Sequence, residues 1–198
     1  MKIVLFLGYS NSGKTTVLTA LTKRIVKRHL GKVGTLKHIH HDPKFTIDAK
    51  GKDTWLHAAS GASVVVSLAP EELAIIRKEQ RVENLSLDSI LSIFRREKVD
   101  YVLVEGLYRK FSRRRGVYKI ICASTEKQAL DLLEEHGTRN IVCITGRIAR
   151  DSKKEIRGIP VLRIPRDIGK IIGLIGADVP KNQQSSREQV GQVQVLVP

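Results

Sequence analysis

The chain has 198 residues, of which 41% are hydrophobic, 28% are charged and 5% are aromatic, and its formal net charge is +15. This length and apolar content suit one compact domain with a single buried core, and they exclude disorder for most of the chain. No apolar run approaches the ~18 residues that a membrane span needs, so we expect a cytoplasmic protein that does not bind membranes.

The basic excess predicts anionic partners. Lysine and arginine number 35 against 20 acidic residues, and they concentrate in residues 23–29, 109–115 and 147–157. Such an excess attracts phosphates and acidic surfaces. Nucleic acid is the less favoured partner, because aromatic residues are few and the chain has no helix-turn-helix or single-strand-binding signature. A solvated basic surface on a protein whose own ligands carry phosphate is the preferred interpretation.

The first predicted strand leads directly into a phosphate-binding loop. Residues 2–7 form a continuous apolar run, as buried parallel strands do. Residues 8–15 then read Gly-Tyr-Ser-Asn-Ser-Gly-Lys-Thr, a complete G-x-x-x-x-G-K-[ST] motif. Apolar residues at helical spacing follow and predict a helix over 14–29. This context favours a nucleotide phosphate as the ligand over a turn that binds nothing.

Each residue type in the loop suits phosphate binding. Gly8 and Gly13 allow a backbone conformation and a close approach that a side chain would block. The N–H groups of residues 11–15 are expected to point into one concavity that favours anions. We expect Lys14 to reach the β- and γ-phosphates and the Thr15 hydroxyl to ligate Mg²⁺. The predicted nucleotide contacts in the loop are Gly8, Asn11, Ser12, Gly13, Lys14, Thr15 and, close to the α-phosphate, Thr16.

Strands and helices alternate along the rest of the chain, which predicts an α/β fold with a mostly parallel sheet between two layers of helices. Further strands are expected at 32–37, 62–68, 73–77, 101–105, 118–123, 140–145 and 160–164, and helices at 53–60, 86–97, 126–136 and 166–175. Residues 69–72 join two of the strands into a hairpin, which predicts an antiparallel edge on the sheet. We expect one nucleotide-binding domain over 1–175 and a tail over 176–198 that is flexible or adds a short strand.

A polar block follows the second predicted strand. It reads Lys37-His-Ile-His-His-Asp42, and Asp48 and Gly51-Lys-Asp53 come after it. Three histidines within four positions can bind a transition metal, but no cysteine pair accompanies them. A loop at the carboxyl edge of the sheet, where open α/β folds bind their ligands, is therefore favoured over a metal site.

The strand over 101–105 carries a second chemical signal at its end. Glu105 closes this apolar run and Gly106 follows it. In phosphate-loop proteins such a strand lies beside the first one, so that its terminal carboxylate meets the Mg²⁺ shell. We expect Glu105 to bind the metal through water or to orient an attacking water. Gly106 would let the chain turn close to the γ-phosphate.

The two cysteines, Cys122 and Cys143, lie within apolar, strand-like runs. Cysteine in such a run usually packs as a small apolar residue. We therefore expect two buried thiols rather than a disulfide or a pair of metal ligands.

Together these motifs resemble the molybdopterin-guanine dinucleotide biosynthesis protein B (MobB) family of phosphate-loop GTP-binding proteins. The resemblance rests on residues 8–16, 33–42, 48–54, 60–62 and 104–106, which occur in family order. The first block is shared by many ATPases and GTPases. The Lys-His-x-His-His-Asp block with Gly-Lys-Asp-Thr after it is specific in combination. The resemblance implies a phosphate-loop NTPase-like fold.

The resemblance also implies a GTP-binding accessory protein in molybdenum cofactor maturation. Such a protein would bind GTP with Mg²⁺, hydrolyse it slowly, and assist the guanylyltransferase that attaches GMP to molybdopterin. Molybdopterin itself or a molybdoenzyme is a further implied partner. Family members are typically homodimers, and the hairpin over 62–77 is the edge at which two copies are expected to meet.

Carry-over onto the matching positions gives the implied site. Lys14, Glu105 and Asp53 are the implied catalytic residues, and Thr15 and Glu105 are the implied Mg²⁺ ligands. The polar block would line the cleft and contact nucleotide, metal or pterin. The contacts implied outside the phosphate loop are Lys37, His38, His40, His41, Asp42 and Gly106.

Departures from the family pattern leave other functions open. The chain has no Asn-Lys-x-Asp signature, and Ile144-Thr-Gly-Arg147 follows the strand over 140–145. A preference for GTP over ATP therefore rests on the resemblance alone. A small-molecule kinase and a nucleotide-gated binding module are the alternatives. Residues 109–115 include five basic residues, which as a hypothesis recruit the phosphate of molybdopterin or an acidic partner.

Overall fold

The computed structural model describes residues 1–39, 45–77, 85–111, 114–150 and 154–176. The chain divides into two compact units: the first is Met1–Leu36 with Lys98–Pro198, and the second is Lys37–Glu97. The expected tail lies outside the described residues from 177 onward, and the single domain over 1–175 stays a prediction.

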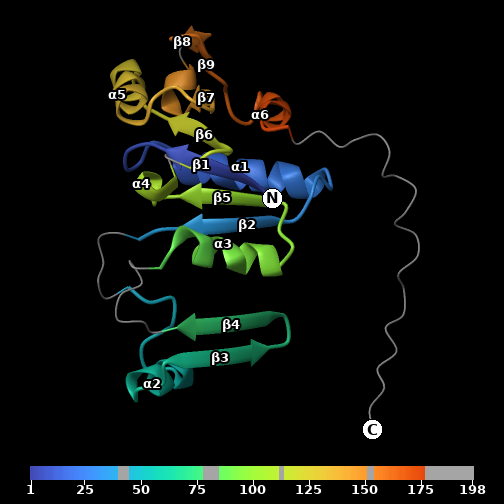
Figure 1. Cartoon of the computed structure of the whole chain (residues 1–198), viewed down its shortest axis with the longest axis vertical. Helices are drawn as coiled ribbons and strands as arrows, with labels where there is room; N and C mark the ends of the chain where they lie inside the picture. Colours follow the sequence, from blue (N-terminus) through green and yellow to red (C-terminus); the bar gives the residue numbers. More distant parts are fainter. Residues whose placement is uncertain (40–44, 78–84, 112–113, 151–153, 177–198) are drawn as a thin grey trace, which may run out of the picture. The chain divides into compact units, whose positions relative to one another are not determined.

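A five-stranded sheet organises the first unit, with the strand order β2-β5-β1-β6-β7. Strand β1 pairs in parallel with β5 and β6, and β6 pairs in parallel with β7. In Figure 1 the arrowheads of β1, β2, β5 and β6 point the same way, so their carboxyl ends meet at one edge. The strands are β1 (Lys2–Leu7), β2 (Val33–Lys37), β5 (Tyr101–Glu105), β6 (Val117–Cys122) and β7 (Ile141–Thr145).

Helices cover both faces of this sheet, which confirms the predicted three-layer α/β fold. Val4 and Phe6 of β1 share one buried cluster with Leu21 and Ile171, which lie on α1 and α6. Alternate strand residues point to the opposite face, where α4 contacts β1 and α5 contacts β6. The helices are α1 (Lys14–Lys27), α4 (Tyr108–Phe111), α5 (Glu126–His136), the 3₁₀ turn η2 (Arg147–Arg150) and α6 (Ile168–Leu174).

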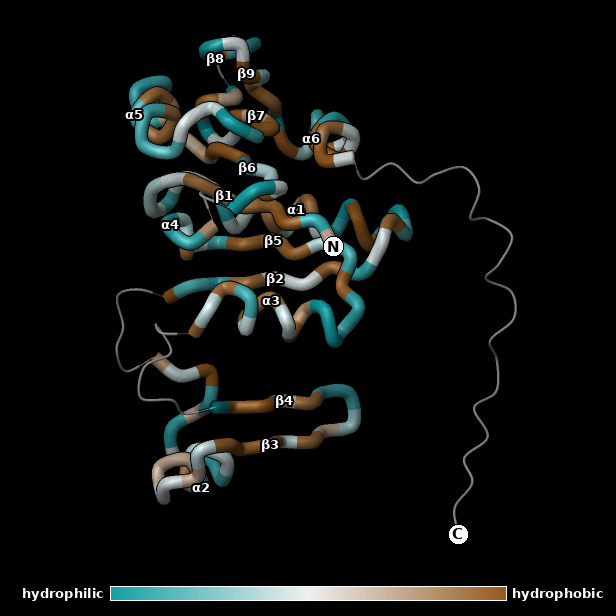
Figure 2. The backbone as a smooth tube through the Cα atoms, viewed as in Figure 1, coloured by the Kyte–Doolittle hydropathy of each residue, from teal (hydrophilic) through white to brown (hydrophobic). Residues whose placement is uncertain are grey.

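The continuous apolar runs explain why the central strands are buried on both faces. Five of the six residues of β1 and all five of β5 are buried, and Figure 2 shows both strands as mainly hydrophobic. Both cysteines are buried and free, as predicted. Burial raises the pKa of the Cys122 thiol to about 12 and that of Cys143 well above its usual value. Both thiols are therefore neutral packing groups.

The second unit contains α2 (Asp53–Ala59), an antiparallel hairpin of β3 (Val64–Ala69) and β4 (Glu72–Arg77), and α3 (Leu87–Arg96). The hairpin was predicted, but its place at the edge of the main sheet is wrong. Among the described residues, β3 and β4 form a two-stranded sheet of their own. The physical reason is that β3 and β4 pair with each other along their whole length, so their inward-facing backbone groups need no third strand. Helix α2 packs against β3.

The strand expected over 160–164 is also wrong. The structure has a short antiparallel pair instead, β8 (Glu155–Ile156) with β9 (Ile159–Pro160), and Val161 makes an isolated parallel bridge to Ile144. Pro160 and Pro165 have no N–H to donate, which limits how far a strand can pair here. Within the described residues, none of the helices is long and apolar enough to cross a bilayer.

Candidate functional site

The phosphate loop is packed tightly against the end of β6. A β-carbon on Gly8 would collide with the carbonyl oxygen of Cys122 and would lie 2.5 Å from Ser12 Oγ, so only glycine fits. Asn11 and Gly13 adopt left-handed backbone conformations, with φ of 59° and 92°. Such alternation of backbone conformation turns successive N–H groups toward one side, as in anion-binding nests. The backbone expected from the motif is therefore present.

The N-terminus of α1 carries no acidic or capping group of its own. Gly13 precedes the helix without a side-chain cap, and the first turn has no acidic residue. The first four N–H groups of a helix have no carbonyl partner within it, and the helix dipole makes this end positive. An anion bound here would satisfy both requirements, which is how helix N-termini bind phosphate.

Lys14 lies back across the loop. Its Nζ donates to the carbonyl oxygens of Gly8 at 2.9 Å and Tyr9 at 2.6 Å. The ammonium group is therefore held at the loop by backbone oxygens rather than extended into solvent. Exchanging these carbonyls for phosphate oxygens requires only a rotation of a flexible side chain.

Glu105 and Thr15 meet at the carboxyl edge of the sheet. The Thr15 hydroxyl donates to Glu105 Oε2 at 2.9 Å. Glu105 is 7% exposed and pairs in register with Phe6 of β1, which places its carboxylate beside the loop. A hydroxyl and a carboxylate are oxygen ligands of the type Mg²⁺ prefers, with water and phosphate completing its shell. Gly106 follows with φ of 93°, so the chain turns immediately after the carboxylate.

The end of β7 supports the loop from the other side, and the sequence analysis missed this contact. A β-carbon on Gly146 would lie 2.6 Å from the Ala123 carbonyl oxygen and 2.9 Å from the Ser12 carbonyl oxygen. The buried hydroxyls of Ser12 and Thr145 have no hydrogen-bond partner within the described part of the chain. A glycine directly after an apolar strand of an α/β fold is the signal that would have identified Gly146.

A set of charged contacts holds the segment after β7 in place. Arg163 donates through Nε to the Ala149 carbonyl at 3.0 Å and through Nη2 to the Arg150 carbonyl at 2.9 Å. Asp167 accepts from the Arg163 backbone N–H and from the Arg166 guanidinium. The hydrogen bond from Arg166 holds the pKa of Asp167 well below its usual value. The same carboxylate pairs with Lys170 Nζ at 3.2 Å, so three basic residues hold it in place.

The predicted residues of the polar block belong to the second unit. Lys37 ends β2 and is exposed, and His38 is half-buried. Asp53 is the exposed first residue of α2. The Thr54 hydroxyl donates to Asp48 Oδ1 at 2.8 Å, which stabilises the turn before this helix. His40, His41 and Asp42 lie outside the described residues.

The structure therefore brings together one group of the predicted site residues. Gly8, the loop up to Thr16, Glu105 and Gly106 lie in the first unit, and Lys37, His38 and Asp53 in the second. No cluster of three or more His, Cys, Asp or Glu suited to a metal ion occurs in the residues that the structure describes.

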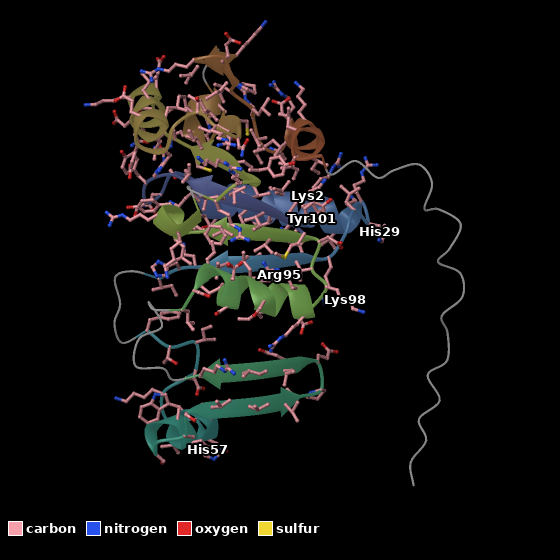
Figure 3. The ribbon with its side chains drawn as sticks, viewed as in Figure 1. Lys2, His29, His57, Arg95, Lys98 and Tyr101 are labelled. Atoms are coloured by element: carbon pink, nitrogen blue, oxygen red, sulfur yellow. The ribbon has the colours of Figure 1, made fainter. Side chains whose placement is uncertain are left out.

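A hollow of about 580 Å³ lies where β2 and β5 begin, which is the opposite end from the phosphate loop. Figure 3 labels His29 and Lys98 here, and also Lys2, whose ammonium lies 5.9 Å from the centre of the Tyr101 ring. No predicted site residue lines this hollow. Open α/β folds bind ligands at the carboxyl ends of their strands, which favours the phosphate loop as the functional site. The lining residues are Val26, His29, Gly31, Lys32, Val33, Lys98 and Asp100.

Comparison with known proteins identifies one matching family. The family model described as "Molybdopterin guanine dinucleotide synthesis protein B" matches residues 3–144, which is more than half of the chain. The molybdopterin-guanine dinucleotide biosynthesis adapter protein of Haemophilus influenzae is 39% identical over 99 residues, 50% of this chain and 53% of that protein. The adapter protein of the same name from Escherichia coli is 31% identical over 104 residues, 52% of this chain and 58% of that protein. The chain thus spans little more than half the length of these curated relatives.

Solved structures of similar proteins have the same fold. The crystal structure of Bacillus subtilis MobB aligns with a TM-score of 0.67 at 23% identity, over 88% of this chain and 98% of that one. A MobB homolog from Bacillus stearothermophilus aligns with a TM-score of 0.60 at 21% identity, over 89% of this chain and 97% of that one. At these identities the likeness supports the fold alone.

The close contact between Gly146 and the loop predicts that a methyl group added at position 146 will disturb the loop. If the loop binds Mg²⁺·GTP as the sequence predicts, Gly146→Ala should weaken this binding by about tenfold, because the Ser12 backbone must move and misplaces the loop N–H groups. Fluorescence titration with a labelled guanine nucleotide would measure this effect.

Gly158→Ala is the matched control, because Gly158 also has positive φ, at 74°, but nothing lies within 4 Å of its β-carbon position. Equal losses of affinity in the two variants would show that backbone strain, rather than contact with the loop, is responsible.

Proposed function

The chain belongs to the molybdopterin-guanine dinucleotide synthesis protein B (MobB) family, and from this premise we propose that it is a Mg²⁺·GTP-binding adapter protein in molybdopterin guanine dinucleotide biosynthesis. The contact between Thr15 and Glu105 at the end of the phosphate loop is the observation that carries the nucleotide part of this proposal. The adapter part is supported by the names of the matching relatives. Its proposed partners are the guanylyltransferase of that pathway and either molybdopterin or a molybdoenzyme. We propose the cytoplasm as its location.

The loop residues would bind the nucleotide through several complementary contacts. The N–H groups at the start of α1 would donate to phosphate oxygens. Lys14 would leave the Gly8 and Tyr9 carbonyls for the β- and γ-phosphates. Thr15 would hold Mg²⁺ directly and Glu105 would hold it directly or through water, and the ion would neutralise charge on the phosphate oxygens. These residue types fit a magnesium-bound triphosphate.

Slow hydrolysis follows from the same contact. Glu105 is buried and already accepts a hydrogen bond from Thr15. The hydrogen bond ties Glu105 to the proposed Mg²⁺ ligand Thr15, so we assign this carboxylate to the metal shell rather than to the activation of an attacking water. We therefore propose that the nucleotide mainly sets the binding state of the adapter and that turnover is slow. Lys37, His38 and Asp53 remain proposed contacts for nucleotide or pterin.

The hairpin of the second unit supports the proposed homodimer. One face is apolar and exposed: Leu68 is 80% exposed, and its register partner Leu73 is 61% exposed. Val66 and Ile75 are a second exposed pair on the same face, and Figure 2 shows both strands as hydrophobic. On the other face Val65 is buried. A contiguous apolar face of this kind typically marks a protein interface, and we propose a second copy of the chain as its partner.

Replacing Lys14 tests the nucleotide site. Lys14→Ala should weaken Mg²⁺·GTP binding by more than about tenfold, since it removes the cation that contacts the terminal phosphates. Calorimetry with GTP and with ATP, each with Mg²⁺, would measure both affinity and base preference, and GTP should bind more tightly.

Lys27→Ala, at the far end of α1, is the control for the loss of one positive charge. Unchanged GTP affinity in Lys14→Ala would contradict the phosphate site. Equal binding of ATP and GTP would contradict the adapter assignment and favour a kinase.

Charges on the hairpin face test the dimer. Replacing both Val66 and Ile75 with lysine should convert dimer to monomer in sedimentation equilibrium, because four like charges would meet at a two-fold interface. Ile93→Lys, at an exposed apolar position on α3, should leave the dimer unchanged. A dimer that persists in the hairpin variant would place the interface elsewhere.

A further inference from the structure

A cationic segment begins immediately after the metal end of the proposed site. Gly106 and Leu107 both have positive φ, at 93° and 52°, and the one-turn helix α4 follows. The N–H groups of Lys110 and Phe111 both donate to the Leu107 carbonyl, at 3.0 and 3.1 Å. Phe111 is completely buried. The start of this segment is therefore fixed to the core within six residues of Glu105.

Aromatic contacts fix the other side of α4. The Tyr108 ring meets the His136 ring edge to face, with centroids 5.3 Å apart. Lys119 Nζ donates to the His136 carbonyl at 3.1 Å, which ties the end of α5 to β6. The Arg109 guanidinium lies 5.9 Å from the centre of the Tyr108 ring. Arg109 is thus held over an aromatic face that is itself anchored.

Three of the described cations of this segment, Arg109, Lys110 and Arg115, are exposed. Within the described chain, neither Arg109 nor Arg115 forms an ion pair with a carboxylate. By contrast, the exposed Arg157 pairs with Glu134 at 3.1 Å, and Arg95 pairs with Asp88 at 3.3 Å. The positive charges of Arg109 and Arg115 are therefore available to a partner.

We propose that Arg109, Lys110 and Arg115 form a docking surface for an acidic protein partner, and that this surface is coupled to the nucleotide through Glu105. The coupling rests on the proposed function, because it requires a bound nucleotide, whereas the docking surface does not. Exposed cations spread along a short helix and the residues after it suit an extended row of carboxylates. A single phosphate would be better held by convergent, half-buried groups. Arginine and tyrosine side by side are also typical of protein interfaces.

The coupling follows from the short, constrained connection. Arg109 lies four residues after Glu105, and two of the three intervening residues adopt left-handed conformations between fixed ends. A shift of Glu105 toward a bound magnesium ion would therefore be transmitted to α4. By thermodynamic linkage, a partner on α4 must then change nucleotide affinity by the same factor as the nucleotide changes partner affinity.

Polyglutamate of about 20 residues serves as the probe for an acidic surface. The variant with Arg109, Lys110 and Arg115 replaced by serine should bind it about tenfold more weakly at low salt, by fluorescence anisotropy. The matched control replaces Lys23, Lys27 and Arg28, exposed residues of another basic cluster, with serine. It removes the same net charge and should change the affinity less than about threefold.

Any of three outcomes would overturn the proposed docking surface. They are equal losses of polyglutamate affinity in the two variants, tighter binding of a single-stranded DNA oligomer than of polyglutamate, or displacement of polyglutamate by millimolar inorganic phosphate at constant ionic strength.

The coupling has its own test. Saturating Mg²⁺·GTP should change polyglutamate affinity at least about threefold in the unmodified protein. No change despite measured GTP binding would overturn the coupling. Failure to bind GTP at all would overturn the proposed function instead, and the comparison of the two variants would still decide the surface.

Discussion

The hydrogen bond between the Thr15 hydroxyl and Glu105 is the contact on which the proposed site depends. It joins the first turn of α1 to the end of β5, and it exists because β1 and β5 pair in register with Phe6 opposite Glu105. The backbone of the loop is held from the other side, where Gly8 packs on β6 and Gly146 packs on the Ser12 carbonyl. A carboxylate, a hydroxyl and a helix N-terminus are thereby fixed on one rigid edge, as a magnesium-bound phosphate requires.

The positive charge of the chain serves several distinct purposes. Arg163 is structural, because its guanidinium binds the Ala149 and Arg150 carbonyls near the loop. Lys119 is 4% exposed and donates to the end of α5, and burial lowers its pKa. Lys14 is held at the phosphate loop. The exposed cations of α4 belong to the proposed partner surface. Because these basic residues have such different roles, the net charge by itself does not indicate a function.

The sequence was informative where a local pattern determines structure. The apolar runs predicted β1 and β5, and the motif predicted the loop, because each depends on a few consecutive residues. The role of Gly146 and the one-turn helix α4 were not predicted, since they depend on contacts with Ser12 and with the core beneath Phe111. The same reason explains the hairpin: periodicity predicted two paired strands, but it does not specify which sheet they join. His40, His41 and Asp42 lie outside the described residues, so their roles stay predictions.

The central claim is that the loop binds a magnesium-bound guanine nucleotide between Lys14, Thr15 and Glu105. A crystal structure with Mg²⁺ and a non-hydrolysable GTP analogue tests it most directly. We expect the β- and γ-phosphates to lie within residues 8–15, Lys14 Nζ to move from the Gly8 and Tyr9 carbonyls to phosphate oxygens, and the metal to bind the Thr15 hydroxyl. A nucleotide bound elsewhere, or Lys14 still on both carbonyls with the analogue present, would contradict it.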